Sequence, residues 1–170
     1  MLSKPAQVVI GMDTDIRLPS RPKEIQRFFE ERFNIEPGLL FCYDKEEWTA
    51  PVASGTGAAD AMVVCPCTAG TLGAMAAGMS DNLIHRAADV ALKERKPLLV
   101  VMRETPYSAI HLENMLKLTR AGAIIMPANP GFYTHPKTVD DIVDFVVAKI
   151  LDQLNISHTL VPKWGHDTEE

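Results

Sequence analysis

The dipeptide Arg103–Glu104 is the pair of residues in this sequence best suited to phosphate chemistry, because it directly follows an apolar run. A guanidinium group can hold a phosphate through two parallel hydrogen bonds. A neighbouring carboxylate can transfer protons when partial burial raises its pKa. The alternative interpretation is a surface Arg–Glu ion pair in a turn that Pro106 makes rigid.

A second candidate segment, Cys-Thr-Ala-Gly-Thr over residues 67–71, also follows an apolar run. Small and hydroxyl residues at the start of a helix expose backbone N–H groups that can bind a polar group of a ligand. Thr68 alone could equally be a helix N-cap with no ligand at all. The segment is not a P-loop, because no Gly-Lys-Ser/Thr sequence follows it.

The third segment, residues 127–136, contains three prolines and the aromatic pair Phe132–Tyr133. Prolines make the loop stiff, and the aromatic side chains supply flat apolar faces and one hydroxyl group. The loop could instead only pack its aromatic rings on the edge of a sheet. We interpret His135 as a solvated loop residue, and His85 and His111 as structural residues within helices. With no histidine beside a nucleophile, a catalytic triad is not expected.

All three segments come after short aliphatic runs at residues 61–65, 97–102 and 122–126, which are typical of strands buried on both faces. Helical patterns lie between and after these runs, over residues 72–93 as one interrupted helix or two, over 108–120, and from Thr138 onward. Alternating strands and helices predict a doubly wound, parallel α/β sheet of three layers. Ligands of such folds bind beyond the carboxyl ends of the strands, which is where the three candidate segments are expected to lie.

The first third of the chain is less regular. Residues 20–33 predict an amphipathic helix, residues 39–43 a short strand, and residues 53–57 a loop of small residues. Residues 1–10 are compatible with a helix capped by Ser3 or with a strand at residues 8–10.

The length of 170 residues predicts one domain, with residues 155–170 as a carboxyl-terminal tail. A formal charge of −5 with scattered Lys and Arg argues against nucleic-acid binding. We expect no membrane span and no signal peptide, and three unpaired cysteines favour the reducing cytoplasm. The sequence offers no acidic metal-binding motif, and we expect no metal.

These segments together closely resemble the flavin prenyltransferase family, of the UbiX and Pad type. The matching stretch runs from about residue 53 to 156, and Ser3–Lys4 resembles the Ser-Lys pair that ends the second strand of the family. The matching motifs are residues 54–55, 66–67, 81–83, 86–90, 92–95, 97–98, 103–106 and 132–133. So many motifs in the same order are highly specific.

The resemblance implies a flavodoxin-like fold that binds FMN between the subunits of a large, dodecamer-like homo-oligomer. It implies transfer of a dimethylallyl group from dimethylallyl monophosphate to FMN. The prenylated FMN then serves a UbiD-type decarboxylase in ubiquinone or aromatic-acid metabolism.

The resemblance also assigns roles to residues. Contacts with FMN are assigned to Ser3, Thr68, Ala69, Gly70, Thr71 and Arg103. Contacts with the substrate are assigned to Lys93, Arg103, Tyr133, Lys149 and Trp164, the last as a tail aromatic that closes over the site. Glu104 is the residue that handles protons, and Arg103 and Lys93 complete the catalytic set. Lys149 stands where many members carry Arg, so it binds phosphate at a single point.

One departure from the family pattern is that members begin with a strand, a Gly-Ala-Ser-Gly-like loop and a helix, which this sequence lacks. The difference is roughly 30–40 residues, the size of one strand–helix unit and the next strand. We therefore expect little product from these 170 residues alone. Two alternative functions stay open, a non-catalytic flavin-binding subunit of a decarboxylase complex and an FMN-dependent cysteine decarboxylase. A cysteine decarboxylase would need a catalytic histidine near its first helix, and the opening segment of this sequence contains no matching histidine.

Overall fold

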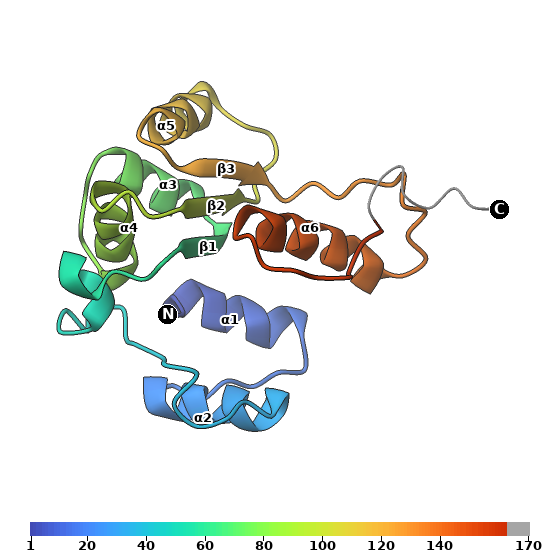
Figure 1. The fold of residues 1–170 in the computed structure, drawn as a ribbon, viewed down its shortest axis with the longest axis horizontal. Coiled ribbons are helices and arrows are strands. Elements are labelled where there is room, and N and C mark those ends of the chain that lie inside the picture. Colours follow the sequence, from blue (N-terminus) through green and yellow to red (C-terminus); the bar gives the residue numbers. More distant parts are fainter. Residues whose placement is uncertain (163–170) are drawn as a thin grey trace.

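Three parallel strands form the centre of the molecule, which was obtained as a computed structural model describing residues 1–162. The strands are β1 (Met62–Cys67), β2 (Leu98–Met102) and β3 (Ile124–Pro127), paired in the order β1-β2-β3. Each strand coincides with one of the apolar runs, so the predicted α/β fold with a parallel sheet is confirmed. Figure 1 shows the strands side by side with helices packed around them.

The helices that connect and follow the strands also match the sequence pattern. They are α3 (Ala69–Ala76) and α4 (Leu83–Lys93) before β2, α5 (Ala109–Arg120) before β3, and α6 (Val139–Gln153) after β3. Residues 72–93 therefore form two helices, separated at Gly78, whose φ of 70° favours glycine. Asn82, Ser108 and Thr138 cap α4, α5 and α6 through their side chains.

The core depends on β2, because every residue of this central strand is buried. Leu98 and Val100 face a cluster that includes Leu72 of α3, Ala88 of α4 and Leu118 of α5. Leu99 and Val101 point to the other face and are equally buried. Burial of each such side chain contributes about 1.5–3 kcal/mol, which fixes the strand between its neighbours.

The amino-terminal region consists of α1 (Lys4–Asp13), α2 (Pro22–Phe33) and two short 3₁₀ turns, Pro51–Ala53 and Gly55–Gly57. The helical alternative for residues 1–10 is the one adopted, with Ser3 as the N-cap. The predicted strand at residues 39–43 is wrong. The segment pairs with no strand of the described sheet, and its Cys42 N–H donates to the Gln26 side chain of α2 at 3.3 Å. Among the described residues, no helix has the length and apolar character needed to cross a membrane.

The two cysteines at the end of β1 differ in their surroundings, and we expect them to differ in reactivity. Cys67 is buried, and this burial raises the pKa of its thiol to about 12, whereas Cys65 is exposed. Because the thiolate is the nucleophile, Cys65 should be alkylated much faster than Cys67 at pH 8. Peptide mass spectrometry after timed iodoacetamide treatment measures both rates, with urea-unfolded protein as the control. Equal rates in the folded protein would contradict this environment for Cys67.

Candidate functional site

The three candidate segments begin at one level of the sheet. Cys67 pairs in register with Met102, and Met102 pairs with Pro127. Neighbouring strands lie about 4.8 Å apart, so Thr68, Arg103 and Ala128 start three adjacent loops at the carboxyl edge. The Ala128 N–H donates to the Met102 carbonyl at 2.9 Å, which fixes the start of the third loop to the last residue of β2.

The first loop is small and leaves its backbone accessible. Thr68 is the N-cap of α3, and its Oγ1 accepts from the Thr71 N–H at 3.2 Å. Capping uses one amide and leaves the N–H groups of Ala69 and Gly70 without an intrahelical partner. Gly70 is exposed, and a Cβ there would meet only the Thr68 hydroxyl at 4.0 Å. A ligand phosphate can therefore approach this turn closely.

The second loop presents two different charged groups. Arg103 is exposed, whereas Glu104 is half-buried and its Oε1 accepts from the Thr105 N–H at 3.3 Å. Among the ion pairs formed by residues 1–162, none joins Arg103 to Glu104. The surface-pair alternative is thus not the arrangement adopted, and the guanidinium group is available to an anion.

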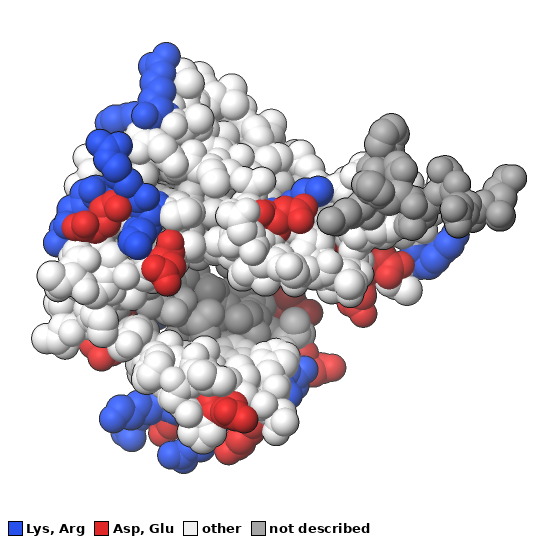
Figure 2. Space-filling model, in the orientation of Figure 1, with Lys and Arg blue, Asp and Glu red and all other residues white. Residues whose placement is uncertain are grey.

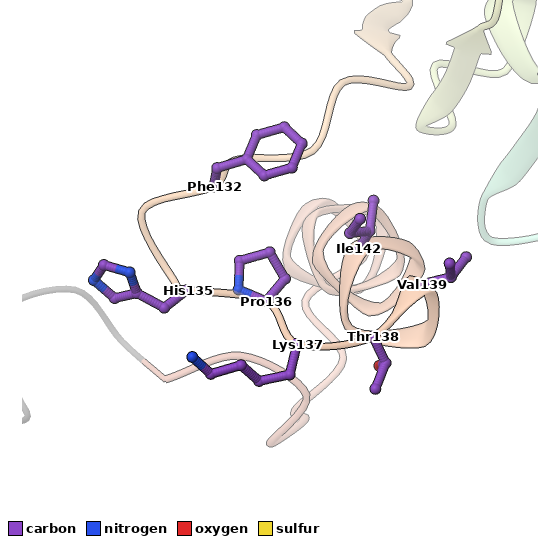
Figure 3. A pocket seen from close by; sticks show the side chains of 7 residues that line it. All are labelled: Phe132, His135, Pro136, Lys137, Thr138, Val139 and Ile142. Atoms are coloured by element: carbon purple, nitrogen blue, oxygen red, sulfur yellow. The ribbon is translucent and has the colours of Figure 1, made fainter.

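The third loop runs from β3 to α6 and places its two aromatic residues differently. Phe132 lines an open groove of about 470 Å³ at the start of α6, together with His135, Pro136, Lys137, Thr138, Val139 and Ile142. Figure 3 shows the rings of Phe132 and Pro136 on the same side as Ile142, while His135 points away from the helix. Tyr133 packs edge-on against Phe145 of α6, with ring centroids 5.8 Å apart. The loop therefore packs partly on α6 rather than on the sheet edge.

Tyr133 and Lys149 line one pocket of about 570 Å³ between α6 and the segment that follows it. The Lys149 ammonium lies 6.0 Å from the centroid of the Phe145 ring and 3.1 Å from Oδ2 of Asp152. Lys149 also lines a second pocket, of about 370 Å³, with Pro127 and other residues of β3. The structure thus brings together the predicted substrate residues Tyr133 and Lys149, next to the end of β3.

Two residues of the pocket were not among the sequence candidates. Asp152 and His158 line it, and hydrogen bonds from His158 and then Lys149 lower the pKa of the Asp152 carboxyl. The spacing of three residues between Lys149 and Asp152 on a helix signals an ion pair. Nothing in the sequence indicates that His158, beyond the helix end, folds back onto the same carboxylate.

Lys93 lies elsewhere in the same chain. It ends α4, which leads back to the amino end of β2, and its ammonium pairs with the adjacent Glu94. The five residues of β2 span about 16 Å, so one chain does not bring Lys93 to the loop of Arg103. Figure 2 shows a mixed group of basic and acidic side chains on the α4 side of the molecule, away from α6.

Of the two site candidates near the ends of the chain, Ser3 lies within the described residues. The Ser3 hydroxyl accepts from the Ala6 N–H at 3.2 Å as the cap of α1. Trp164 lies outside the described residues. Within residues 1–162, no group of three or more His, Cys, Asp or Glu side chains is arranged to hold a metal ion.

Comparisons with known proteins show the family to which the chain belongs. A family model described as Flavoprotein matches residues 3–151. The flavin prenyltransferase UbiX of Pseudomonas aeruginosa is 53% identical over 165 residues, which cover 97% of this chain and 79% of the relative. The UbiX of Alkalihalophilus pseudofirmus is 51% identical over 140 residues, covering 82% of this chain and 70% of the relative.

Solved structures give the same result. AnUbiX (PadA1), in complex with FMN and dimethylallyl pyrophosphate, is 38% identical with a TM-score of 0.82, covering 96% of this chain and 79% of that one. A dodecameric FMN-dependent Ubix-like decarboxylase from Escherichia coli O157:H7 is 40% identical with a TM-score of 0.80, covering 95% of this chain and 80% of that one. The predicted family and its flavodoxin-like fold are therefore confirmed, and the chain belongs to the UbiX family of flavin prenyltransferases.

Proposed function

We propose that this protein transfers a dimethylallyl group from dimethylallyl monophosphate to FMN. The observation that carries the proposal is the register of the sheet, which starts the Thr68, Arg103 and Ala128 loops side by side. A flavin and an allylic phosphate need different groups at one place. This edge supplies backbone amides, a guanidinium and a carboxylate, and we propose that Tyr133, in the pocket beside α6, supplies an aromatic hydroxyl. AnUbiX, a relative with the same fold, binds FMN and dimethylallyl pyrophosphate.

FMN fits the first loop. Its phosphate can accept from the free N–H groups at the start of α3, and its approach to Gly70 is open. Thr68 and Thr71 would add hydroxyl groups to this site, and Arg103 on the next loop would add a positive charge. When bound, FMN supplies the ring that accepts the prenyl group and an aromatic face that favours developing positive charge.

The leaving phosphate is stabilised by the cationic and hydroxyl groups beside it. Cleavage of an allylic C–O bond develops negative charge on the phosphate, and donors fixed near that charge lower the barrier. Arg103 can bind two phosphate oxygens at once, Lys149 one, and the Tyr133 hydroxyl can donate to a third. We propose that the second loop binds the substrate phosphate on one side. On the other side it is bound by the Tyr133 pocket, which is the cavity of about 570 Å³ between α6 and the segment that follows it.

Glu104 is the proposed proton carrier. Its Oε1 accepts from the Thr105 N–H, which holds the carboxylate in place and leaves Oε2 to take or return a proton. The half-buried position of the side chain reduces competition from water.

The role proposed for Lys93 requires a neighbouring subunit. Lys93 lies at the amino edge of its own sheet, so we propose that it reaches a phosphate bound by an adjacent protomer. The E. coli relative is a dodecamer, and we propose a similar homo-oligomer with sites between subunits.

Ser3 is proposed to contact FMN, and Trp164 to close over the substrate. A UbiD-type decarboxylase in the cytoplasm, in ubiquinone or aromatic-acid metabolism, is the proposed user of the product.

We expect the chain extended by the family's amino-terminal strand, loop and helix, incubated with reduced FMN and dimethylallyl monophosphate, to yield a flavin heavier by one dimethylallyl group, and these 170 residues alone to yield little. Mass spectrometry of the extracted flavin measures it, and dimethylallyl alcohol in place of the phosphate is the control. Bound but unmodified FMN in the extended chain would support the flavin-binding subunit instead and would contradict a transferase.

The variant Glu104→Gln should slow prenyl transfer by at least about 100-fold, the usual contribution of a proton-transferring side chain. FMN affinity should stay within about two-fold, because the amide still accepts from Thr105. Flavin fluorescence titration and product formation measure the two effects separately, with Glu113→Gln, at an exposed position of α5, as the matched control. Equal loss of binding and turnover would assign Glu104 a structural role.

A further inference from the structure

One carboxylate, that of Asp152, carries two partners on the wall of the Tyr133 pocket. His158 Nε2 lies 3.0 Å from Oδ1, and Lys149 Nζ lies 3.1 Å from Oδ2. The three side chains come from the last turns of α6 and from the segment that follows the helix. All three line the same cavity as Tyr133.

The hydrogen bonds around His158 determine which way its ring donates. The Leu160 N–H donates to His158 Nδ1 at 3.3 Å, so Nδ1 is the acceptor and Nε2 carries the proton. Nε2 therefore donates to Asp152. The imidazole is only 13% exposed, which fixes its position far better than that of the half-exposed Lys149 side chain.

This arrangement affects how much of the Lys149 charge a phosphate can use. A carboxylate that is otherwise unpaired would compete with the phosphate for the ammonium group and would repel the phosphate itself. The donor from His158 withdraws charge from the carboxylate and keeps Oδ1 turned away from Lys149. One N–H of Lys149 then goes to Oδ2, and its other two are left for a ligand.

We propose that His158 is a positioning residue that, by holding Asp152, keeps Lys149 available to the phosphate of the prenyl donor. The inference rests on the proposed function, in which Lys149 binds that phosphate. A lysine needs such help more than an arginine, because its single nitrogen must serve carboxylate and phosphate together. An arginine offers separate N–H groups to each.

A double-mutant cycle tests the proposal, with dimethylallyl monophosphate varied at saturating FMN. His158→Ala should raise KM for the phosphate about five-fold, the equivalent of one lost hydrogen bond, with kcat within about two-fold. Asp152→Asn should leave KM at or below the wild-type value. The double variant should match Asp152→Asn, because no carboxylate remains to compete. Thr159→Ala, in the same segment, is the control and should leave KM unchanged.

Two results would overturn the inference. One is an unchanged KM in His158→Ala. The other is an increase in Asp152→Asn as large as in His158→Ala with no recovery in the double variant, which would show that the contact merely holds the segment in place. Calorimetric binding of dimethylallyl monophosphate to the FMN-loaded variants repeats the cycle without turnover. If the extended chain forms no product but the binding cycle follows the predicted order, prenyl transfer fails, whereas phosphate binding by Lys149 and this inference stand.

Discussion

The register of the parallel sheet is the constraint on which the candidate site depends. Hydrogen bonding between strands aligns Cys67, Met102 and Pro127, so three loops that are distant in sequence begin next to one another. The backbone pairing defines this register, and a slip of β2 by one residue would exchange the side chains that pack on its two buried faces. A local side-chain contact could be lost without moving the site, whereas a change of register would dismantle it.

The strands and most helices were predictable because their signals are local. Continuous aliphatic runs predict buried parallel strands, and Thr138 followed by acidic residues predicts the start of α6. The position of the candidate loops followed from topology alone, since parallel strands end at one edge. The strand expected at residues 39–43 failed because side-chain periodicity cannot reveal that the Cys42 N–H pairs with the Gln26 side chain of α2.

The site itself was only partly predictable. Tyr133 and Lys149 come together through Phe145, a contact that depends on how the third loop turns onto α6. His158 could not have been found, because the chain folds back onto Asp152 after the helix has ended. Lys93 could be placed by topology once α4 was recognised, because a helix between parallel strands returns to their amino ends.

Several apolar side chains on the surface fit a chain that works in an assembly. Val8 and Met12 of α1 and Ile110 of α5 are more than half exposed in the single chain. Exposed apolar surface of this kind is typical of subunit contacts. A neighbouring protomer at such a surface would also provide the proposed route for Lys93 to the site.

The most direct test of the account is a crystal structure of the protein with FMN and dimethylallyl monophosphate. We expect the FMN phosphate on the first-turn amides of α3, and the substrate phosphate between Arg103, Tyr133 and Lys149. A flavin bound in the groove of Phe132 and Ile142, or at the amino edge of the sheet beside Lys93 of the same chain, would contradict it.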